Sequence, residues 1–335
     1  MNEGGGQVVP EPGATGRLPP FSSRTRLLVV APHPDDETIA TGVLVQQVRA
    51  AGGEVRILLL TEGDNNPWPQ RWLERRVVIN ASDRRRWGRR RHDEMLQALR
   101  CLEVPPDALQ SMGWPDLGLV GRVLHARDAT VSALRAAIEQ FGPSLLVAPA
   151  LADRHPDHAA AHVLVRLALA SMANPPPLLV YLVHARAGSG GGAAIDIAAT
   201  AAQAARKDEA LVAHHSQMAL SARRLRRLAS GAETHAAVAP TQASLPWQPS
   251  VWLRPWLRLS LVGPAGTLRW RWNDAPLRRD GAGRYQLAVP AAVAGQPSFV
   301  RLALDLQSPW IFDHWGWCEL AASSFEAGAE SGQRD

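Results

Sequence analysis

The sequence predicts an α/β protein whose mostly parallel sheet is flanked by helices and followed by a C-terminal antiparallel β extension. Two observations predict this fold. Between residues 24 and 240, short apolar runs alternate with longer stretches rich in alanine, valine and leucine, as strands that alternate with helices do. After about residue 240 the apolar residues follow a period of two, which is typical of half-buried antiparallel strands.

The first strand–helix–strand unit lies at residues 24–61. Residues 27–31 predict a buried strand, 38–51 a helix that ends at Gly52-Gly53, and 55–61 a second strand. Strands joined in this way run parallel, with a right-handed crossover. A polar, arginine-rich segment at 62–86 follows. The later elements are helices at 89–102 and 129–141, a strand at 145–150, a helix at 158–172, a strand at 177–183, and helices at 198–213 and 219–228.

The region beyond residue 240 contains eight of the twelve tryptophans, and a buried core is the commoner use of such strands than a sugar-binding platform. We therefore predict four parts: a disordered leader at 1–23, a main domain at 24–240, a Trp-rich antiparallel β domain at 241–322 and a tail at 323–335. The alternating positions are Leu257/Leu259/Leu261, Leu268/Trp270/Trp272, Leu287/Val289 and Val300/Leu302/Leu304/Leu306.

The composition is that of an ordinary globular protein, with 46% hydrophobic and 20% charged residues. The two cysteines, Cys101 and Cys318, exclude a disulfide framework and a Cys-rich zinc site. No apolar run approaches the roughly 18 residues of a membrane span, and the Gly/Pro-rich N-terminus lacks the layout of a signal peptide. We expect a cytoplasmic protein, and its net charge of +5 suits an acidic partner without identifying one.

Two short motifs carry the chemistry: Pro-His-Pro-Asp-Asp-Glu at 32–37 and His-Pro-Asp-His at 155–158. Each follows an apolar run that predicts a strand, and open α/β sheets build their sites at the carboxyl ends of strands. We therefore expect the two motifs to meet in one crevice. There His33, Asp36 and His158 would supply two imidazoles and one carboxylate to a metal ion, which leaves a position open for water.

The remaining groups of the motifs fit a metal-dependent hydrolase. Asp35 would act as the general base for the metal-bound water, and His155 would stabilise the oxyanion or protonate the leaving group. Zn²⁺ is the expected metal, although Fe²⁺ also suits two histidines and one carboxylate. The structural alternative is that residues 35–37 only cap the following helix. Two such motifs, each at a strand end, favour the metal site.

On these motifs the chain resembles the LmbE-like, or PIG-L, zinc-dependent N-deacetylases. The hallmarks are Val29 to Glu37 and the motif at 155–158, with weaker agreement at 61–64, 91–94 and 207–217, so that the resemblance covers about residues 24–230. It implies a Rossmann-like, LmbE-type fold and hydrolysis of the N-acetyl group of a GlcNAc-type amino sugar in a glycoconjugate. It also implies His33, Asp36 and His158 as zinc ligands, Asp35 as base and His155 at the oxyanion.

The chain departs from this family in one detail of the second motif. Some members carry a tyrosine just before it that assists at the oxyanion, whereas Asp153-Arg154 stand there in this chain. The role of that tyrosine is therefore vacant or filled elsewhere.

Further residues are candidates for substrate binding, each with a structural alternative. Arg91 and Glu94 could pair near the site or form an ordinary helix pair, and His184 could be a core histidine. The other candidates are Asp64 and His215. Nine arginines between Arg71 and Arg91 predict either a solvated helix face or a patch for a phosphate-bearing substrate, such as a lipid-linked amino sugar. Nucleic acid is not expected, and peripheral contact with a membrane is compatible with the sequence.

Two alternatives to the deacetylase remain at this point. An amidase for a larger N-acyl group would use the same attack by water, because the sequence does not show the size of the acyl pocket. A non-catalytic carbohydrate-binding protein of the same fold is the other alternative, and the presence of Asp35 argues against it. Oligomeric state and the role of the β domain, which could be docking or dimerisation, are left open.

Overall fold

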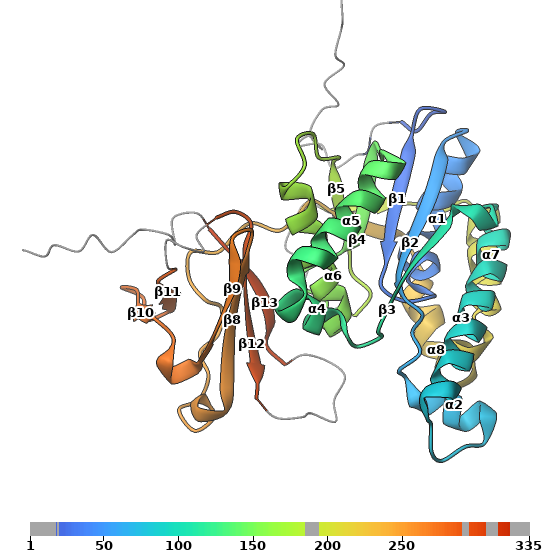
Figure 1. The fold of residues 1–335 in the computed structure, drawn as a ribbon. Helices are drawn as coiled ribbons and strands as arrows, with labels where there is room; N and C mark the ends of the chain where they lie inside the picture. The colour runs from blue at the N-terminus through green and yellow to red at the C-terminus, as the bar shows by residue number, and fades with distance from the viewer. Residues whose placement is uncertain (1–17, 19, 185–193, 290–294, 306–313, 322–335) are drawn as a thin grey trace, which may run out of the picture.

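The computed structural model describes residues 18, 20–184, 194–289, 295–305 and 314–321. Its main body is a seven-stranded sheet of order β3-β2-β1-β4-β5-β7-β6 (Figure 1). The first five strands in the chain pair in parallel and the last two pair antiparallel, which confirms the mostly parallel sheet. The strands are β1 (Arg26–Ala31), β2 (Glu54–Thr61), β3 (Leu109–Trp114), β4 (Leu145–Pro149), β5 (Leu178–Tyr181), β6 (Ala194–Ile197) and β7 (Glu233–Ala236).

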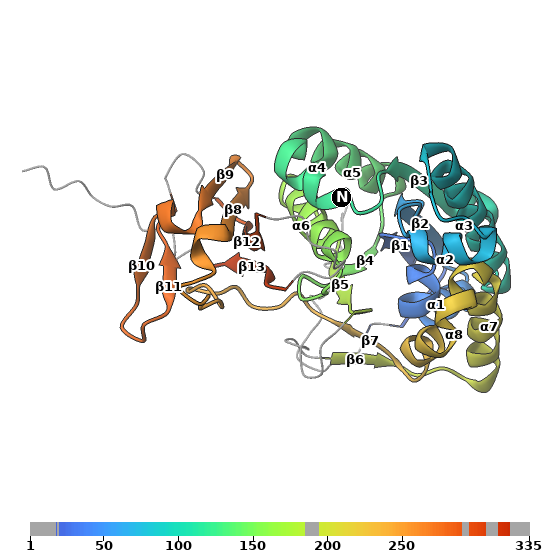
Figure 2. The same ribbon diagram turned by 90° about the horizontal axis from the view of Figure 1, so that it is seen from below.

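Helices cover both faces of this sheet (Figure 2). Along β1, Leu27 and Val29 pack into one core and Leu28 and Val30 into the other. Burial on both faces explains why the strand is a continuous apolar run. One face carries α1 (Asp36–Ala50), α3 (Ala81–Cys101), α7 (Ala201–Ala213) and α8 (His215–Ala229), and the other carries α4 (Leu119–His125), α5 (Arg127–Phe141) and α6 (Pro156–Ala170).

The arginine-rich segment differs from the prediction. Residues 67–74 form a short helix, α2 (Pro67–Glu74), and α3 begins at Ala81 instead of residue 89. Asn80 caps α3, because its side chain accepts hydrogen bonds from the backbone N–H groups of Ser82 and Asp83. The sequence contains this cap, but the run of charged residues after it hid the helical period.

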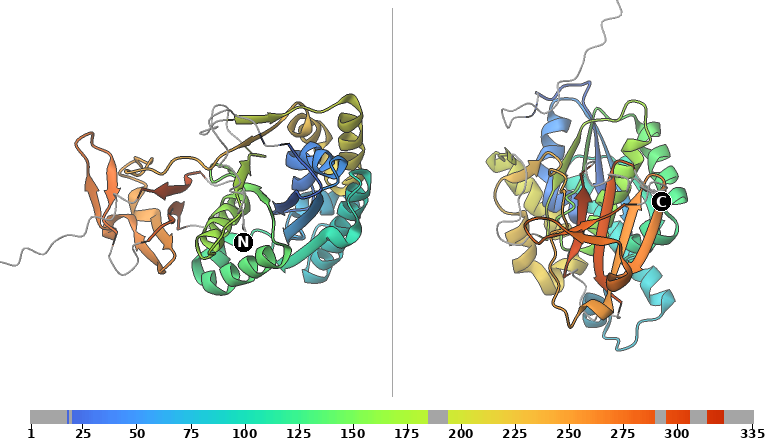
Figure 3. Two further views of the ribbon diagram at one scale, coloured as in Figure 1. Left: turned by 90° about the horizontal axis from the view of Figure 1, so that it is seen from above. Right: turned by 90° about the vertical axis from the view of Figure 1, so that its left-hand side faces the viewer.

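The C-terminal region forms an antiparallel sheet, as expected. It has the order β13-β12-β8-β9 and lies beside α4 and α6 (Figures 1 and 3). One face of the sheet builds its own core, and the other places Val262, Phe299 and Trp317 in the core that contains α5 and α6. The strands are β8 (Leu257–Gly263), β9 (Gly266–Arg271), β12 (Ser298–Leu304) and β13 (Gly316–Leu320), with the hairpin β10 (Leu277–Arg279) and β11 (Tyr285–Leu287).

The short 3₁₀ turns are η1 (Pro106–Ala108), η2 (Arg254–Trp256) and η3 (Trp272–Asp274). Trp247, Trp272 and Trp317 are buried, as the core interpretation expects, whereas Trp252 and Trp256 of the same region are exposed. Some predicted features lie outside the described residues: positions 1–17 and 19 of the leader, the tail at 323–335, and Leu306. No helix of the described chain is long and apolar enough to cross a membrane.

The strand order reverses between β1 and β4. The chain passes from β1 to β2 and β3 on one side, and from β4 to β5 on the other. In doubly wound folds, the carboxyl ends of the two strands at such a reversal border the ligand crevice. The first motif follows β1 and the second follows β4, so the fold brings the two motifs to this crevice.

Candidate metal centre

The two motifs meet, as the sequence predicts. The N-terminus of α1 carries Asp36 and the N-terminal turn of α6 carries His158, so each motif leads from a strand into a helix. The rings of His33 and His158 stack at 5.3 Å between centroids. Both histidines and Asp36 are buried, with His158 fully inaccessible.

Three donor atoms form a compact triangle. Asp36 Oδ2 lies 3.4 Å from His33 Nδ1 and 3.2 Å from His158 Nε2, and the two nitrogens are 3.3 Å apart. Metal–ligand bonds of about 2.0–2.1 Å in tetrahedral geometry separate neighbouring donors by about 3.4 Å. These residues therefore fit a divalent metal ion with one position left open. His33 and His158 also form a possible metal-binding set with His155, whose donor atoms all lie within 4.8 Å of one another.

The charge around His33 also suits a cation. Its Nε2 faces Asp116 Oδ1 at 3.3 Å and Asp157 Oδ2 at 3.4 Å. Burial alone would lower the pKa of His33, but the carboxylates of Asp116, Asp157 and Asp36 raise it well above its usual value. The site thus favours positive charge at the point where the donor triangle lies, which a divalent metal would supply.

Asp153 orients His158. Its Oδ2 lies 3.1 Å from His158 Nδ1 and accepts hydrogen bonds from the backbone N–H groups of Val183 and His184. A proton held at Nδ1 by this carboxylate leaves the Nε2 lone pair directed at the triangle, as in most metal-binding histidines. Burial opposes protonation of His158, but Asp36 and Asp153 raise its pKa to about 10.

Asp35 lies beside the triangle in an unusual backbone conformation, with φ of 116°. Its N–H donates to Glu37 Oε2 at 3.0 Å, and Arg91 approaches its Oδ2 at 3.4 Å. Burial raises the pKa of Asp35 to about 6, although Arg91 opposes the shift. A carboxylate with this pKa can take up and release a proton near neutral pH.

His155 is placed by its position at the start of α6. Its Nδ1 accepts a hydrogen bond from the backbone N–H of Asp157 at 3.3 Å, so a neutral ring carries its proton on Nε2. Burial, followed by the nearby His33 and His158 rings, lowers the pKa of His155 well below its usual value. These effects favour the neutral ring, whose centroid lies 4.6 Å from that of the His33 ring.

A cavity of about 170 Å³ opens onto these groups. Of the predicted substrate-binding residues, Arg91 and His184 line it. Arg91 donates to the carbonyls of Gly63 and Pro34, and so fixes the loops after β1 and β2. His184 Nδ1 lies 3.4 Å from Asp153 Oδ1. Further lining residues come from α8, among them Gln217, Ser221 and Arg224.

The other three candidates do not line this cavity. Glu94 is buried, and its two carboxylate oxygens share a hydrogen bond from the backbone N–H of Ser216. It forms an ion pair with Arg90 instead of Arg91. His215 is exposed on α8, while its neighbour His214 is buried against Glu37 at 3.1 Å. Asp64 lies half-buried, with its Cβ close to Gly88. The structure therefore does not bring these three predicted substrate-binding residues to the cavity.

Sequence reasoning missed Asp116, Asp153 and Asp157 as residues of the centre. Asp153 and Asp157 stand in or next to the second motif, so the local pattern contained them without showing their task. Asp116 follows β3, an edge strand whose weak apolar pattern gave no element to place it on.

The arginine run is mainly a solvated surface of α3. Arg84, Arg85 and Arg89 are exposed, and Arg86 pairs with Glu74 and Asp83. Of this run, only Arg91 lines the cavity, and Trp87 is fully buried as an anchor.

Residues 28–169 match the family model described as PIG-L, GlcNAc-PI de-N-acetylase. A 1D-myo-inositol 2-acetamido-2-deoxy-alpha-D-glucopyranoside deacetylase of Mycolicibacterium gilvum (strain PYR-GCK) is 32% identical over 171 residues, which are 47% of this chain and 59% of that protein. The deacetylase of the same description from Mycobacterium avium (strain 104) is 36% identical over 146 residues, 40% of this chain and 47% of that protein. The chain thus spans about half the length of the curated relatives it matches.

A solved structure supports the fold. A deacetylase triple mutant of the teicoplanin biosynthetic pathway aligns with a TM-score of 0.50 and 22% identity, over 63% of this chain and 97% of that chain. The architecture, the two hallmark motifs and the family match agree. Residues 28–169 of the chain are therefore similar to the PIG-L (LmbE-like) family.

Proposed function

We propose that this protein is a metal-dependent hydrolase that removes the N-acetyl group from a GlcNAc-type amino sugar in a glycoconjugate. The observation that carries the proposal is the triangle of His33 Nδ1, Asp36 Oδ2 and His158 Nε2 beside the half-buried Asp35. The matched relatives, described as deacetylases of an acetamido sugar linked to inositol, support the substrate class.

His33, Asp36 and His158 would hold the metal, with zinc proposed and ferrous iron suited to the same donors. When bound, the metal supplies a positive charge that polarises the amide carbonyl and acidifies a water molecule beside it. Asp116, Asp157 and Asp153 keep the two imidazoles oriented through their other ring nitrogens.

Asp35 acts as the general base in this proposal. It takes a proton from the attacking water onto its carboxylate and then delivers a proton to the amine nitrogen as the C–N bond breaks. Acetate and the free amino sugar leave. Arg91, which contacts both the Pro34 carbonyl and Asp35, holds the carboxylate in place.

His155 stabilises the oxyanion. A neutral ring with the proton on Nε2 donates a hydrogen bond to the carbonyl oxygen as negative charge develops on it. The same protonation state argues against His155 as the proton donor to the leaving amine, which favours the first of the two roles predicted for it. His184 and the polar residues of α8 would contact the sugar.

Acetate release from a panel of GlcNAc conjugates, with purified protein and added zinc, tests this function. Asp35→Ala is assayed beside the wild type. We expect release by the wild type and a loss of a hundredfold or more in the variant. Stoichiometric zinc binding without release from any conjugate would contradict the deacetylase.

A further inference from the structure

We propose that a second, larger cavity beside the metal centre binds a hydrocarbon chain of the substrate. The proposal rests on the proposed function, and it adds to that function a class of substrate with a long apolar group. That group would be either the N-acyl chain or a lipid aglycone, because both offer the same methylene surface to the protein.

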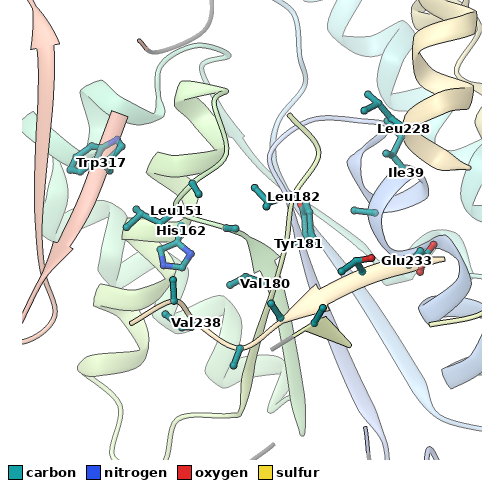
Figure 4. Close-up of a pocket in the computed structure, with 18 of the residues that line it drawn as sticks. Ile39, Leu151, His162, Val180, Tyr181, Leu182, Leu228, Glu233, Val238 and Trp317 are labelled. Carbon is teal, nitrogen blue, oxygen red and sulfur yellow. The ribbon is translucent and has the colours of Figure 1, made fainter. Parts of the chain in front are cut away.

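The cavity lies at the seam between the main sheet and the C-terminal sheet. It measures about 510 Å³, three times the volume of the cavity at the metal centre and within the range of small-molecule sites. Figure 4 shows its lining residues spread across β5, from Ile39 and Leu228 on one side to Trp317 on the other.

The walls are apolar and the charges in them are already paired. Lys207 Nζ lies 2.6 Å from Glu233 Oε1, and Glu319 forms two bonds of 2.8 and 2.9 Å with Arg166. No charged group that lines the cavity among the described residues therefore needs an ionic ligand. The apolar lining side chains include Ile39, Leu151, Val180, Leu182, Leu228, Val238 and Trp317.

The large cavity, called the chamber from here on, adjoins the cavity at the metal centre. Ile39 and Leu228 line both cavities, and Ile39 stands three residues after the metal ligand Asp36 on α1. A substrate whose amide lies at the metal can therefore extend an attached chain past Ile39 and Leu228. This continuity distinguishes the cavity from an isolated packing defect.

His162 adds one polar position to the chamber. The carbonyl of Pro149 accepts a hydrogen bond from His162 Nδ1 at 2.9 Å. A neutral ring then carries its proton on Nδ1, and Nε2 is a hydrogen-bond acceptor. His162 is buried, and Nε2 has no hydrogen-bond partner among the described residues. A chain that bears a hydroxyl or an amide N–H could donate to this atom.

The first test is a chain-length series in two arms. One arm varies the alkyl glycoside of GlcNAc from methyl to decyl, and the other varies the N-acyl group of glucosamine from acetyl to decanoyl. In the arm that carries the true chain, we expect KM to fall by about fourfold per methylene that enters the chamber. KM that is independent of chain length in both arms would overturn the proposal.

The second test measures binding without turnover. Decyl glucoside and N-decanoylglucosamine are titrated calorimetrically into His158→Ala, with methyl glucoside and N-acetylglucosamine as short controls. We expect at least one long ligand to bind at least tenfold more tightly than its short control. Equal affinity of the long and short ligands in both pairs would overturn the proposal.

Chamber-filling variants locate the binding. Ala236→Phe on β7 and the half-buried Val238→Trp, each combined with His158→Ala, should weaken the long ligand by tenfold or more. Ala136→Phe, at an exposed position on α5, should not change it. Undiminished binding of the long ligand in both chamber-filling variants would overturn the proposal. Binding of the long ligand without any deacetylation would support the chamber as a binding site and contradict the proposed activity. Deacetylation without binding of the long ligand would support the activity and contradict the chamber.

Discussion

Asp35 has a strained backbone conformation at the candidate metal centre. Its φ of 116° is a region that residues with a Cβ rarely adopt, and such strain costs on the order of 1–3 kcal/mol. The hydrogen bond from its backbone N–H to Glu37 and the contact of its carboxylate with Arg91 hold Asp35 in this conformation. A strained, half-buried carboxylate next to the three proposed metal donors is better explained by catalysis than by helix capping. The Asp35 side chain indeed makes no capping hydrogen bond to α1.

We predict that Asp35→Asn lowers kcat for acetate release by a hundredfold or more, because an amide cannot accept the proton. Metal content should stay at the wild-type level, since Asp35 is not part of the donor triangle. Asp36→Asn is the matched control and should lose metal and activity together. Loss of metal from Asp35→Asn would place this residue among the ligands instead.

Asp153 gives a second prediction at this scale. Asp153→Asn should weaken metal affinity by about 10–100-fold, because His158 loses the carboxylate that holds its proton at Nδ1. Competition with a chromogenic chelator measures the affinity. Asp107→Asn, at an exposed position, is the control and should bind metal normally. Unchanged affinity in Asp153→Asn would show that His158 is oriented by packing alone.

How far the sequence predicts single residues depends on local pattern. The approach of His33, Asp36 and His158 was predictable, because both motifs follow apolar runs that end at the same edge of a parallel sheet. Asp116 was not, because its side chain reaches His33 only through the strand order. The sequence also does not show which of two adjacent histidines is buried: His214 is buried, whereas His215, the first residue of α8, is exposed.

At the scale of elements, a buried ion pair joins three of them. Glu233 of β7 contacts Lys207 of α7 and accepts hydrogen bonds from the backbone N–H groups of Val43 and Leu44 in α1. The pair also forms part of the chamber wall. It therefore ties the antiparallel edge of the sheet to the helix that carries the first motif.

We predict that Lys207→Met lowers the free energy of unfolding by about 3–5 kcal/mol, because it leaves Glu233 buried without a counter-charge. The double variant Lys207→Met/Glu233→Gln should recover part of this loss, which urea denaturation would measure. A double variant less stable than Lys207→Met would show that the hydrogen bonds to α1 outweigh the charge pairing.

The strands that the sequence missed share a physical cause. β3, β6 and β7 lie at or near the edges of the sheet, and their strands are half-exposed or only four residues long. Such strands lack the continuous apolar run that marks β1, β2 and β4. The central strands and the helices that cover them were predictable, since burial on both faces dictates their composition.

For the whole molecule, we propose a domain boundary near residue 240, as the sequence suggests. Val262, Phe299 and Trp317 place the C-terminal sheet in the core that contains α6, the helix of the second motif. Removal of residues 241–335 would expose this apolar face. We expect the truncated chain to aggregate or to unfold at a lower temperature than the full chain in a thermal scan. An equal unfolding temperature would show that the main domain is independent.

Two buried histidines should make the stability depend on pH. Burial lowers the pKa of His162 and of His235 to about 4, from 6.5. The unfolded chain therefore binds protons between pH 6.5 and 4 that the folded chain does not, so stability falls as the pH falls through this range. Each histidine should contribute about 2 kcal/mol of loss between pH 7 and pH 5.

Urea denaturation at the two pH values checks this. His235→Gln should show a smaller loss than the wild type, whereas His125→Gln, at an exposed position on α4, should show the same loss. An unchanged loss in His235→Gln would mean that this histidine does not stay neutral in the folded protein.

The most direct test of the central claim, that His33, Asp36 and His158 hold one catalytic metal ion, is a zinc titration of chelator-stripped protein. Acetate release from a GlcNAc conjugate is followed as zinc is added. We predict that activity rises linearly and stops rising at one equivalent per chain, and that His158→Ala shows neither activity nor this break. Full activity in the stripped protein, or an undiminished response in His158→Ala, would contradict the account.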